Sequence, residues 1–431
     1  MVLNLKTKQD QVMTMSDKAS QITTADGMPL KISLRRAERK KRIKGLLFLV
    51  PALAFILMTF IMPIADMLLR GAYIGEVKEL LHHTVISLED WDGEGIPDES
   101  TFHTLAQEIG LLNKNRLLGK VALRLNYEKS GMRNLFTQTG RKIKKIDSGP
   151  YIDKLIALDA RWGDRETWTI IKRLGKGLTM THYLAAFDLK YDVNNRIVSQ
   201  PEALQIHSRI WLRTLWVSLL LTALCVLLGY PVAYLLANLP LKTSNLLMIC
   251  VLLPFWTSIL VRLTSWIVLL QKQGVINDIL VWVGILSDEN RIRMVYNMTG
   301  TFIAMIQVLL PFMILPLYSV MKTIDPSYRR AARSLGANPV RAFWEVYVPQ
   351  TLPGIGAGSI LVFILAVGYY ITPALVGGST GQLISNFIAL HMSKTLNWGL
   401  AAAMGTILLS LVLVVYWLYN RLIGIENMKL G

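Results

Sequence analysis

Cysteine and charge are both scarce in this chain of 431 residues. It holds only two cysteines, Cys225 and Cys250, and both fall inside apolar runs, which excludes a disulfide framework and a thiolate metal site. Charged residues make up 17% of the chain, against roughly 25% in ordinary globular chains, and 52% of the residues are hydrophobic. This composition excludes disorder of the whole chain and argues against a soluble enzyme.

Six long apolar runs account for the hydrophobic excess. Each is long enough for a helix rising about 1.5 Å per residue to cross a hydrocarbon layer of about 30 Å. The runs cover residues 45–69, 210–238, 246–270, 299–321, 354–376 and 399–422. The sequence therefore predicts an all-α polytopic membrane protein with six transmembrane helices. Two shorter apolar segments, 274–287 and 383–392, are expected to lie at the membrane interface.

Basic side chains are unevenly distributed between the polar segments. Residues 1–44 carry 11 basic and 4 acidic side chains and residues 322–350 carry 5 and 2, whereas residues 71–207 carry 19 and 18. Cytoplasmic loops of membrane proteins hold the excess of Lys and Arg, so both termini are expected in the cytoplasm. The formal charge of +17 is thereby explained without a nucleic-acid partner.

The same pattern divides the chain into segments. Residues 1–44 lack a hydrophobic period and are predicted to be a flexible basic cytoplasmic tail, whose basic end either binds anionic groups or only orients the following span. The first span, residues 45–70, is expected to remain as an anchor because it is too long for a cleaved signal. Residues 71–207 form an extracytoplasmic insert, residues 208–425 a transmembrane core, and residues 426–431 a cytoplasmic C-terminus.

The insert is predicted to be mainly helical. Its segments 102–118, 120–135, 151–160 and 167–174 space their apolar residues by three or four. It also holds five of the six histidines, but none forms an i, i+4 pair with a nearby carboxylate, so no metal site is expected. The insert either holds a partner protein at the outer mouth or is a decoration specific to this lineage.

Catalytic and nucleotide-binding motifs are missing from the sequence. It contains no Gly-rich phosphate loop, no nucleophile elbow and no paired membrane carboxylates, so no catalytic residue is assigned and the chain is not expected to be an enzyme. The charged groups within the spans are few, notably Asp66 and Arg262. Arg262 is predicted to form either a structural ion pair or part of a pathway, because a charge at that depth is costly.

The most specific pattern lies in the cytoplasmic loop at residues 322–350. Two short helices are expected on either side of Gly336, which can take a positive φ and end the first of them. Ala331 and Ala332 leave a flat helix face that another protein can approach closely. The alternative is an ordinary basic loop between two spans.

This loop resembles the Glu-Ala-Ala coupling loop of permease subunits from binding-protein-dependent ABC importers of the type I fold. The resemblance assigns an ATPase-coupling helix to residues 328–341, and the family's acidic residue is replaced by Arg330, which inverts the charge. Flanking motifs at 254–257, 310–318 and 368–378 look like the spermidine/putrescine permease branch. The matching residues of the loop are Arg330, Ala331, Ala332, Leu335, Gly336, Ala337, Phe343 and Pro349.

The resemblance implies the permease subunit of an ATP-driven importer in the bacterial inner membrane. Such a chain moves a small organic solute, here of the polyamine class, by alternating access between inward- and outward-facing states. The implied partners are a second homologous permease, two cytoplasmic ATPase subunits and a periplasmic solute-binding protein, which the insert at residues 71–207 would contact. ATP and magnesium would bind on the ATPase subunits, and this chain would hold no cofactor.

Candidate residues for the solute pathway come from the spans. Aromatic rings attract ammonium groups, although aromatic residues are also enriched at membrane interfaces for other reasons. The candidates are Trp256, Arg262, Trp266, Tyr369 and Tyr370. Two other functions stay open at this point: an ion-coupled secondary carrier, and a membrane receptor or sensor that uses the insert.

Overall fold

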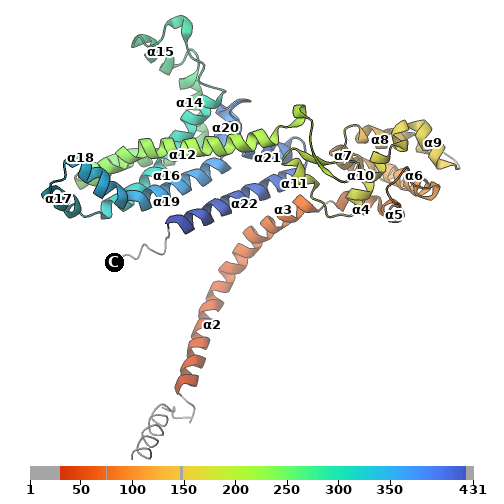
Figure 1. The fold of residues 1–431 in the computed structure, drawn as a ribbon, viewed down its shortest axis with the longest axis horizontal. Helices are drawn as coiled ribbons and strands as arrows, with labels where there is room; N and C mark the ends of the chain where they lie inside the picture. Colours follow the sequence, from red (N-terminus) through yellow and green to blue (C-terminus); the bar gives the residue numbers. More distant parts are fainter. Residues whose placement is uncertain (1–29, 74, 146–148, 424–431) are drawn as a thin grey trace, which may run out of the picture. The chain divides into compact units, whose positions relative to one another are not determined.

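A computed structural model describes residues 30–73, 75–145 and 149–423 of the chain (Figure 1). The chain divides into two compact units at residue 66. Residues 1–29 of the predicted tail and the predicted C-terminal segment 426–431 lie outside the described residues. The described part is predominantly helical, as predicted.

The first helix begins well before the predicted span. Helix α2 (Leu30–Ile56) continues through the π-helical turn η1 (Leu57–Ile61) into α3 (Met62–Ala72). The prediction of a flexible tail is therefore wrong for residues 30–44, which are helical. The physical reason is that the Arg, Lys and Ala residues of this run favour helix and extend a helix that the span has already nucleated.

Four long helices pack together as the centre of the transmembrane core. They are α12 (His207–Asn238), α16 (Met298–Thr323), α19 (Val348–Gly368) and α22 (Trp398–Ile423). Helices α12, α16 and α19 contact one another, and α22 contacts α19 (Figure 1). The shorter helices of the core are α13 (Leu241–Leu252), α14 (Ile259–Leu270), α15 (Val275–Trp282), α20 (Ile371–Val376) and α21 (Ile384–Ser393).

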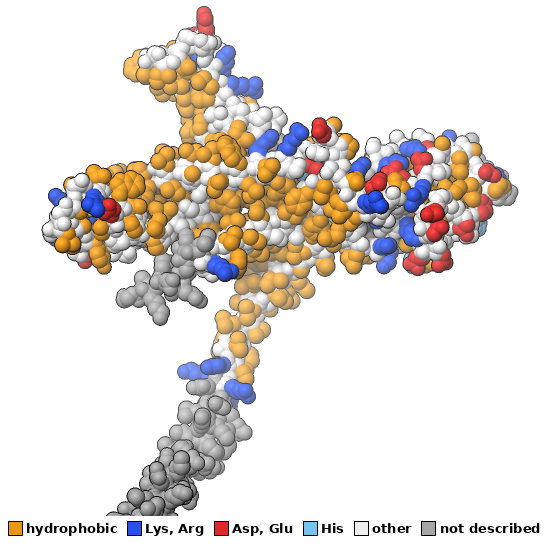
Figure 2. Space-filling view, in the orientation of Figure 1, with side chains coloured by type: hydrophobic (Ala, Val, Ile, Leu, Met, Phe, Trp, Pro, Cys, Tyr) orange, Lys and Arg blue, Asp and Glu red, His pale blue; other side chains and the backbone are white. Residues whose placement is uncertain are grey.

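Six helices of the described residues are long and apolar enough to cross a membrane, which confirms the predicted number. They are Arg39–Ala72, His207–Asn238, Ile259–Trp282, Met298–Thr323, Pro339–Gly368 and Trp398–Arg421. In the view of Figure 2, hydrophobic side chains cover the helices of the core, whereas charged side chains gather over the insert. An apolar surface of this extent is what contact with lipid requires.

The third span differs from its prediction. Residues 246–270 were expected to form one helix, but the chain leaves α13 through a 3₁₀ turn, η5 (Leu253–Trp256), and is extended at Thr257 and Ser258 before α14 begins. Pro254 lies in this turn and has no N–H to continue an α-helix. By length and hydropathy the candidate span is Ile259–Trp282, which joins α14 and α15 across a non-helical break at residues 271–274.

Glycines allow α16 and α19 to approach closely. A side chain at Gly358 would place its Cβ 2.6 Å from Met313 Sδ and 3.2 Å from the Met313 carbonyl oxygen. At Gly354, the Cβ would lie 3.0 Å from Val320 Cβ. The two glycines are four residues apart on α19, which is the spacing that membrane helices use for close packing.

We expect Gly358→Ala to destabilise the core by about 1 kcal/mol, because the added methyl group must displace part of Met313. Gly368→Ala is the matched control, since it lies at the end of the same helix with nothing within 4 Å of the added carbon. The measurement is the midpoint of thermal unfolding of the detergent-purified chain. Equal midpoints for the two variants would contradict the close packing of α16 and α19.

The insert between the first two spans is mainly helical, as predicted. Its helices are α4 (Gly75–Leu80), α5 (His82–Ser87), α6 (Glu99–Lys114), α7 (Leu118–Asn126), α8 (Met132–Lys142), α9 (Tyr151–Leu158), α10 (Arg165–Gly175) and α11 (Thr181–Ala185). Three 3₁₀ turns, η2 (Ile143–Lys145), η3 (Ala160–Gly163) and η4 (Glu202–Leu204), and one antiparallel pair of strands, β1 (Leu189–Tyr191) and β2 (Ile197–Ser199), complete it. The helical segment expected at 120–135 is interrupted at Gly131, which has a φ of +93°.

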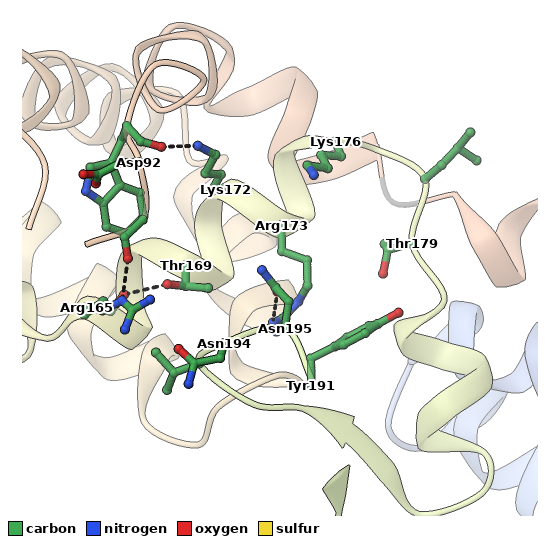
Figure 3. Close-up of a pocket in the computed structure, with 14 residues that line it drawn as sticks. Asp92, Arg165, Thr169, Lys172, Arg173, Lys176, Thr179, Tyr191, Asn194 and Asn195 are labelled. Carbon is green, nitrogen blue, oxygen red and sulfur yellow. Dashed lines mark hydrogen bonds between the residues drawn. The ribbon is translucent and has the colours of Figure 1, made fainter. Parts of the chain in front are cut away.

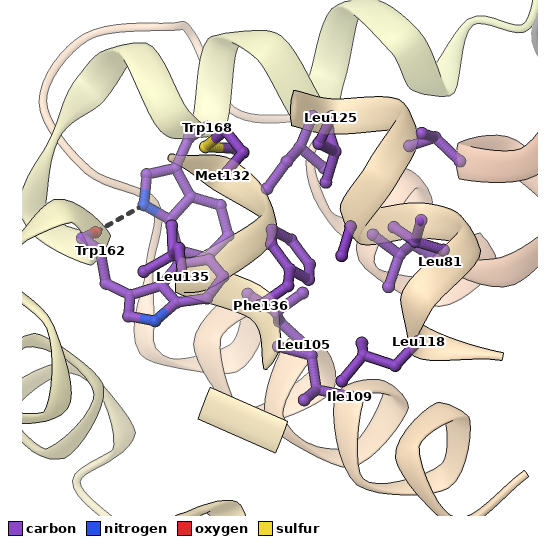
Figure 4. Packing of buried hydrophobic residues seen from close by; sticks show 14 of the residues in the cluster. Leu81, Leu105, Ile109, Leu118, Leu125, Met132, Leu135, Phe136, Trp162 and Trp168 are labelled. Carbon is purple, nitrogen blue, oxygen red and sulfur yellow. Dashed lines mark hydrogen bonds between the residues drawn. The ribbon is translucent and has the colours of Figure 1, made fainter. Parts of the chain in front are cut away.

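The insert has its own hydrophobic core (Figure 4). Trp162 and Trp168 lie at one side of it with ring centroids 5.8 Å apart, and both side chains are fully buried. The indole N–H of Trp168 donates to the Trp162 carbonyl at 2.8 Å, and that of Trp162 donates to Thr139 Oγ1 at 2.9 Å. Because both polar atoms have partners, the two large rings are buried without an unsatisfied donor.

Hydrogen bonds connect the insert to the spans. The carboxylate of Asp188 accepts the backbone N–H of His207 at 3.1 Å and of Ser208 at 2.8 Å, so it caps the first turn of α12. The hydroxyl of Tyr127 donates to the carbonyl of Thr395 at 2.7 Å, just before α22. The insert is therefore attached to the core at several points of the chain.

Candidate functional site

The loop between the fourth and fifth spans folds into two helices at an angle set by a glycine. Helix α17 (Ser327–Ser334) ends at Gly336, which has a φ of +94°. The N–H of Gly336 donates to the Arg333 carbonyl at 3.0 Å and the N–H of Ala337 donates to the Ala332 carbonyl at 3.1 Å. These two bonds are the Schellman arrangement that closes a helix, and they confirm the predicted role of Gly336.

The second helix begins immediately after this glycine. The side chain of Asn338 accepts the backbone N–H of Arg341 at 2.7 Å and caps α18 (Pro339–Arg341). A π-helical turn, η7 (Ala342–Tyr347), then leads into α19. Since α18, η7 and α19 form one continuous helical segment, the second helix of the loop is also the beginning of the fifth span.

Arg329 attaches α17 to the transmembrane core. One terminal nitrogen of its guanidinium donates to the Tyr234 hydroxyl and the other to Asn238 Oδ1, both at 2.9 Å. The guanidinium also lies over the rings of Tyr347 and Tyr234, with its carbon 5.0 and 5.9 Å from the ring centroids. Charge-assisted hydrogen bonds and ring contacts together hold the helix against the end of α12.

The aromatic rings around Arg329 form a cluster of their own. Phe343 is stacked on Tyr347 with centroids 5.7 Å apart, and both rings meet Tyr234 edge to face at 5.5 and 5.4 Å. Phe343, one of the predicted coupling residues, therefore packs inward and supports the anchoring of α17.

The other predicted coupling residues lie toward the outside. Leu335 is 90% exposed, and Tyr328, Val340 and Trp344 are exposed apolar neighbours in the same loop. Arg330, Ala331 and Pro349 are also exposed, and Ala332 and Ala337 are half-buried. Apolar side chains gathered on an otherwise basic loop are typical of a surface that another protein covers.

The predicted pathway residues are only partly brought together. Arg262 and Trp266 lie one turn apart on α14, and the indole N–H of Trp266 donates to Gln307 Oε1 on α16 at 3.4 Å. Arg262 lies within electrostatic reach of Tyr369, and its Nε is buried without a hydrogen-bond partner among the described residues.

The other two predicted pathway residues are Trp256 and Tyr370. Trp256 is 73% exposed in the turn before α14. The carbonyl of Tyr370 accepts the side-chain N–H of Asn386 at 3.0 Å.

The sequence did not predict the residues that anchor α17, which are Arg329, Tyr234, Asn238 and Tyr347. Arg329 stands beside Arg330 in the same basic run, and nothing in the run distinguishes the two. The available signal was the pair Tyr234 and Asn238, which are four residues apart and therefore on one face of α12 near its C-terminal end.

Comparisons with known proteins find similar transport proteins. Residues 226–423 match the family described as binding-protein-dependent transport system inner membrane component. The spermidine/putrescine transport system permease protein PotB of Escherichia coli K12 is 36% identical over 222 residues, which are 51% of this chain and 80% of that protein. PotB of Haemophilus influenzae is 37% identical over 222 residues, 51% of this chain and 77% of its own. A solved bacterial alginate ABC transporter in complex with an alginate pentasaccharide-bound periplasmic protein covers 72% of this chain and 99% of its own, with 17% identity and a TM-score of 0.43.

The chain belongs to the family of binding-protein-dependent transport system inner membrane components. It is a permease subunit of a type I ABC importer and a multi-pass protein of the inner membrane, which confirms the resemblance stated from the coupling loop. Membership in this family disfavours an ion-coupled carrier or a receptor. The match begins at residue 226, so the first span and the insert lie outside it.

Proposed function

We propose that the chain imports a small organic cation of the polyamine class, driven by ATP hydrolysis on partner subunits. The observation that carries this proposal is the identity of 36% with a spermidine/putrescine permease over 80% of that protein's length. The aromatic side chains near α14 and the end of α19 support it, since aromatic faces attract ammonium groups. This chain is a transport subunit that holds no cofactor, and ATP and magnesium bind elsewhere in the complex.

The proposed complex contains a second homologous permease, two cytoplasmic ATPase subunits and a periplasmic binding protein. The ATPases dock on residues 328–341, where exposed Leu335 and Val340 supply apolar contact. Because Arg330 replaces the family's acidic residue, the ATPase should present an acidic group opposite it. Both termini lie in the cytoplasm and the insert lies outside, where it contacts the binding protein.

Uptake by the reconstituted complex tests the proposed function. We expect accumulation of radiolabelled spermidine or putrescine in proteoliposomes that contain the partner subunits, the binding protein and internal ATP, and no accumulation without ATP. Uptake that survives without ATP and collapses with an ion gradient would establish a secondary carrier instead. No flux under either condition would favour a receptor.

We expect Gly336→Trp to lose the ATPase subunits during mild-detergent purification, while the second permease remains bound. Any L residue at a φ of +94° is strained, and the indole would stand in the proposed docking surface. Gly284→Trp is the matched control, because Gly284 also has a positive φ, +79°, and open space around it, but lies after α15. Mass spectrometry of the co-purified chains gives the result, and retention of the ATPase by Gly336→Trp would place the docking surface elsewhere.

A further inference from the structure

A cavity of about 470 Å³ lies within the insert, and neither the coupling loop nor the predicted pathway contributes to it (Figure 3). Helix α10 forms one wall, residues 91–93 form a second, and the turn between β1 and β2 forms a third. The charged residues that line it are Asp92, Arg165, Lys172, Arg173 and Lys176. Four of these five side chains are basic.

The basic residues share one face of α10 and its C-terminal end. They occur at positions i, i+7, i+8 and i+11, which fall on the same side of a helix with 3.6 residues per turn. The opposite side of α10 carries Trp168, Ile171 and Leu174, which are fully buried in the core of the insert. Packing of the apolar side therefore turns the basic side toward the cavity.

Neutral groups hold two of these cations, Lys172 and Arg165, in place without cancelling their charge. Lys172 Nζ donates to the carbonyls of Glu89, at 3.2 Å, and Trp91, and lies 5.8 Å from the centre of the Trp91 ring. Arg165 Nε donates to the carbonyl of Gly93. Carbonyl oxygens and rings fix the positions of the ammonium and guanidinium groups but carry no net negative charge. The positive charge of the cavity is therefore arranged in advance of any ligand.

The acidic side chains behind the cavity are already engaged. Glu128 accepts from Arg124 at 2.9 Å and from Arg173 at 3.3 Å, and the three side chains are 6%, 7% and 12% exposed. This buried trio keeps one net positive charge, and Arg173 Nε has no hydrogen-bond partner among the described residues. Glu166 pairs with Lys129 at 2.6 Å. Glu76 lies within electrostatic reach of Arg124 and offsets part of this charge. Arg173, however, lines the cavity and keeps a buried donor without an acceptor, so an anion there would stabilise this arrangement.

We propose that this cavity binds an anion bearing phosphate or carboxylate groups. Its volume falls within the range of roughly 300–1,000 Å³ that small-molecule sites occupy. Thr169, Asn194 and Asn195 add neutral polar groups to the lining. The lining has more basic than acidic side chains and would repel a polyamine, so the ligand is chemically different from the solute under the proposed function. The inference does not depend on that function.

Binding to the purified full-length chain tests this proposal. In neutral detergent free of anionic lipid, sodium pyrophosphate or sodium citrate should bind saturably by isothermal titration calorimetry. In the double variant Lys172→Gln/Lys176→Gln the affinity should fall about tenfold or more, since two of the four cations are lost. Lys176→Gln alone should weaken binding severalfold, and this exposed side chain can be changed without disturbing the fold.

The matched control is Lys114→Gln/Lys144→Gln, which removes two lysines from another cavity of the insert, of about 460 Å³. It should bind both probes like the wild type.

A second experiment identifies the source of the anion. Phosphatidylglycerol or phosphatidylcholine is added to the micelles, and bound lipid is detected by native mass spectrometry. Phosphatidylglycerol that is retained through Lys172 and Lys176 would identify a lipid headgroup, whereas probe binding unaffected by either lipid would identify a soluble anion. Failure of all three anions to bind, or equal binding by both double variants, would overturn the proposal.

Discussion

Replacing Arg329 by alanine is expected to reduce solute uptake by the assembled complex at least tenfold. The guanidinium makes two hydrogen bonds of 2.9 Å to α12 and two ring contacts, and bonds to a charged group contribute about 1.5–3 kcal/mol each. Without them, α17 still packs against η7 but loses its hydrogen bonds to α12. A conformational cost of about 1.4 kcal/mol is already a factor of ten in the competent population. Uptake in proteoliposomes with the partner subunits is the measurement.

Two variants distinguish the loss of the Arg329 contacts from a general effect of removing a positive charge. Lys242→Ala removes an exposed cation from the first turn of α13, outside residues 328–341, and should leave uptake within about twofold of the wild type, because surface substitutions away from such contacts have small effects. Tyr234→Phe keeps the ring and loses only the hydroxyl acceptor, so its uptake should be intermediate. If Arg329→Ala transports at the wild-type rate, the attachment of α17 to α12 has no part in coupling.

The contrast between Gly336 and Arg329 shows which features of the loop can be predicted from the sequence and which cannot. A glycine after an alanine-rich helical run can end the helix, so the positive φ of Gly336 was predictable from local chemistry. The importance of Arg329 depends on Tyr234 and Asn238, which are more than 90 residues away in the sequence. Three arginines stand in one short run, and only the folded chain distinguishes the anchored one from Arg330 and Arg333.

The spans show the same limit at a larger scale. Hydrophobic content predicts their number, because crossing a membrane requires a minimum apolar length. It does not predict where the helix is interrupted, since Thr257 and Ser258 are as compatible with a helix as with an extended turn. Pro254 is compatible with a break, but the position of α14 follows from its contacts with α15, α16 and α20.

The insert was predictable as helical, but its cavity was not. The spacing of the basic residues on α10 places them on one face, which periodicity can show. The opposing walls come from residues 91–93 and 191–195, which precede and follow α10 in separate segments. A cavity lined from three separate segments has no signature in any one of them.

Acid pH is expected to destabilise the chain through His182, by about 2 kcal/mol at pH 5. The ring is 4% exposed and packs against Gly399 at the start of α22, where an added Cβ would lie 2.2 Å from Nε2. Burial, assisted by the nearby charge of Arg124, lowers the pKa of His182 from 6.5 to about 3. Arg70 and Glu76 line the same small cavity as His182 and Arg124.

The direction of this pH effect depends on whether the folded or the unfolded chain binds the proton. Below pH 6.5 the unfolded chain protonates this histidine, whereas the folded chain does not until about pH 3. The unfolded state therefore binds more protons in this window, and the folded state loses stability as the pH falls from 6.5 toward 3. pH 5 lies about 1.5 units below 6.5, the pKa of His182 in the unfolded chain. Each unit lowers the free energy of unfolding by about 1.36 kcal/mol, which gives about 2 kcal/mol in total.

The measurement is urea unfolding of the detergent-purified full chain at pH 7.5 and pH 5, followed by tryptophan fluorescence. His182→Gln removes the titrating group, so its free energy of unfolding should depend less on pH than that of the wild type by about 2 kcal/mol over this interval. His391, whose burial lowers its pKa from 6.5 to about 4, is present in both proteins and cancels in the comparison. His83→Gln, at an exposed histidine, should behave like the wild type. An unchanged pH dependence in His182→Gln would mean that His182 is protonated in the folded chain at pH 5 and that the contact with Gly399 opens to admit the proton.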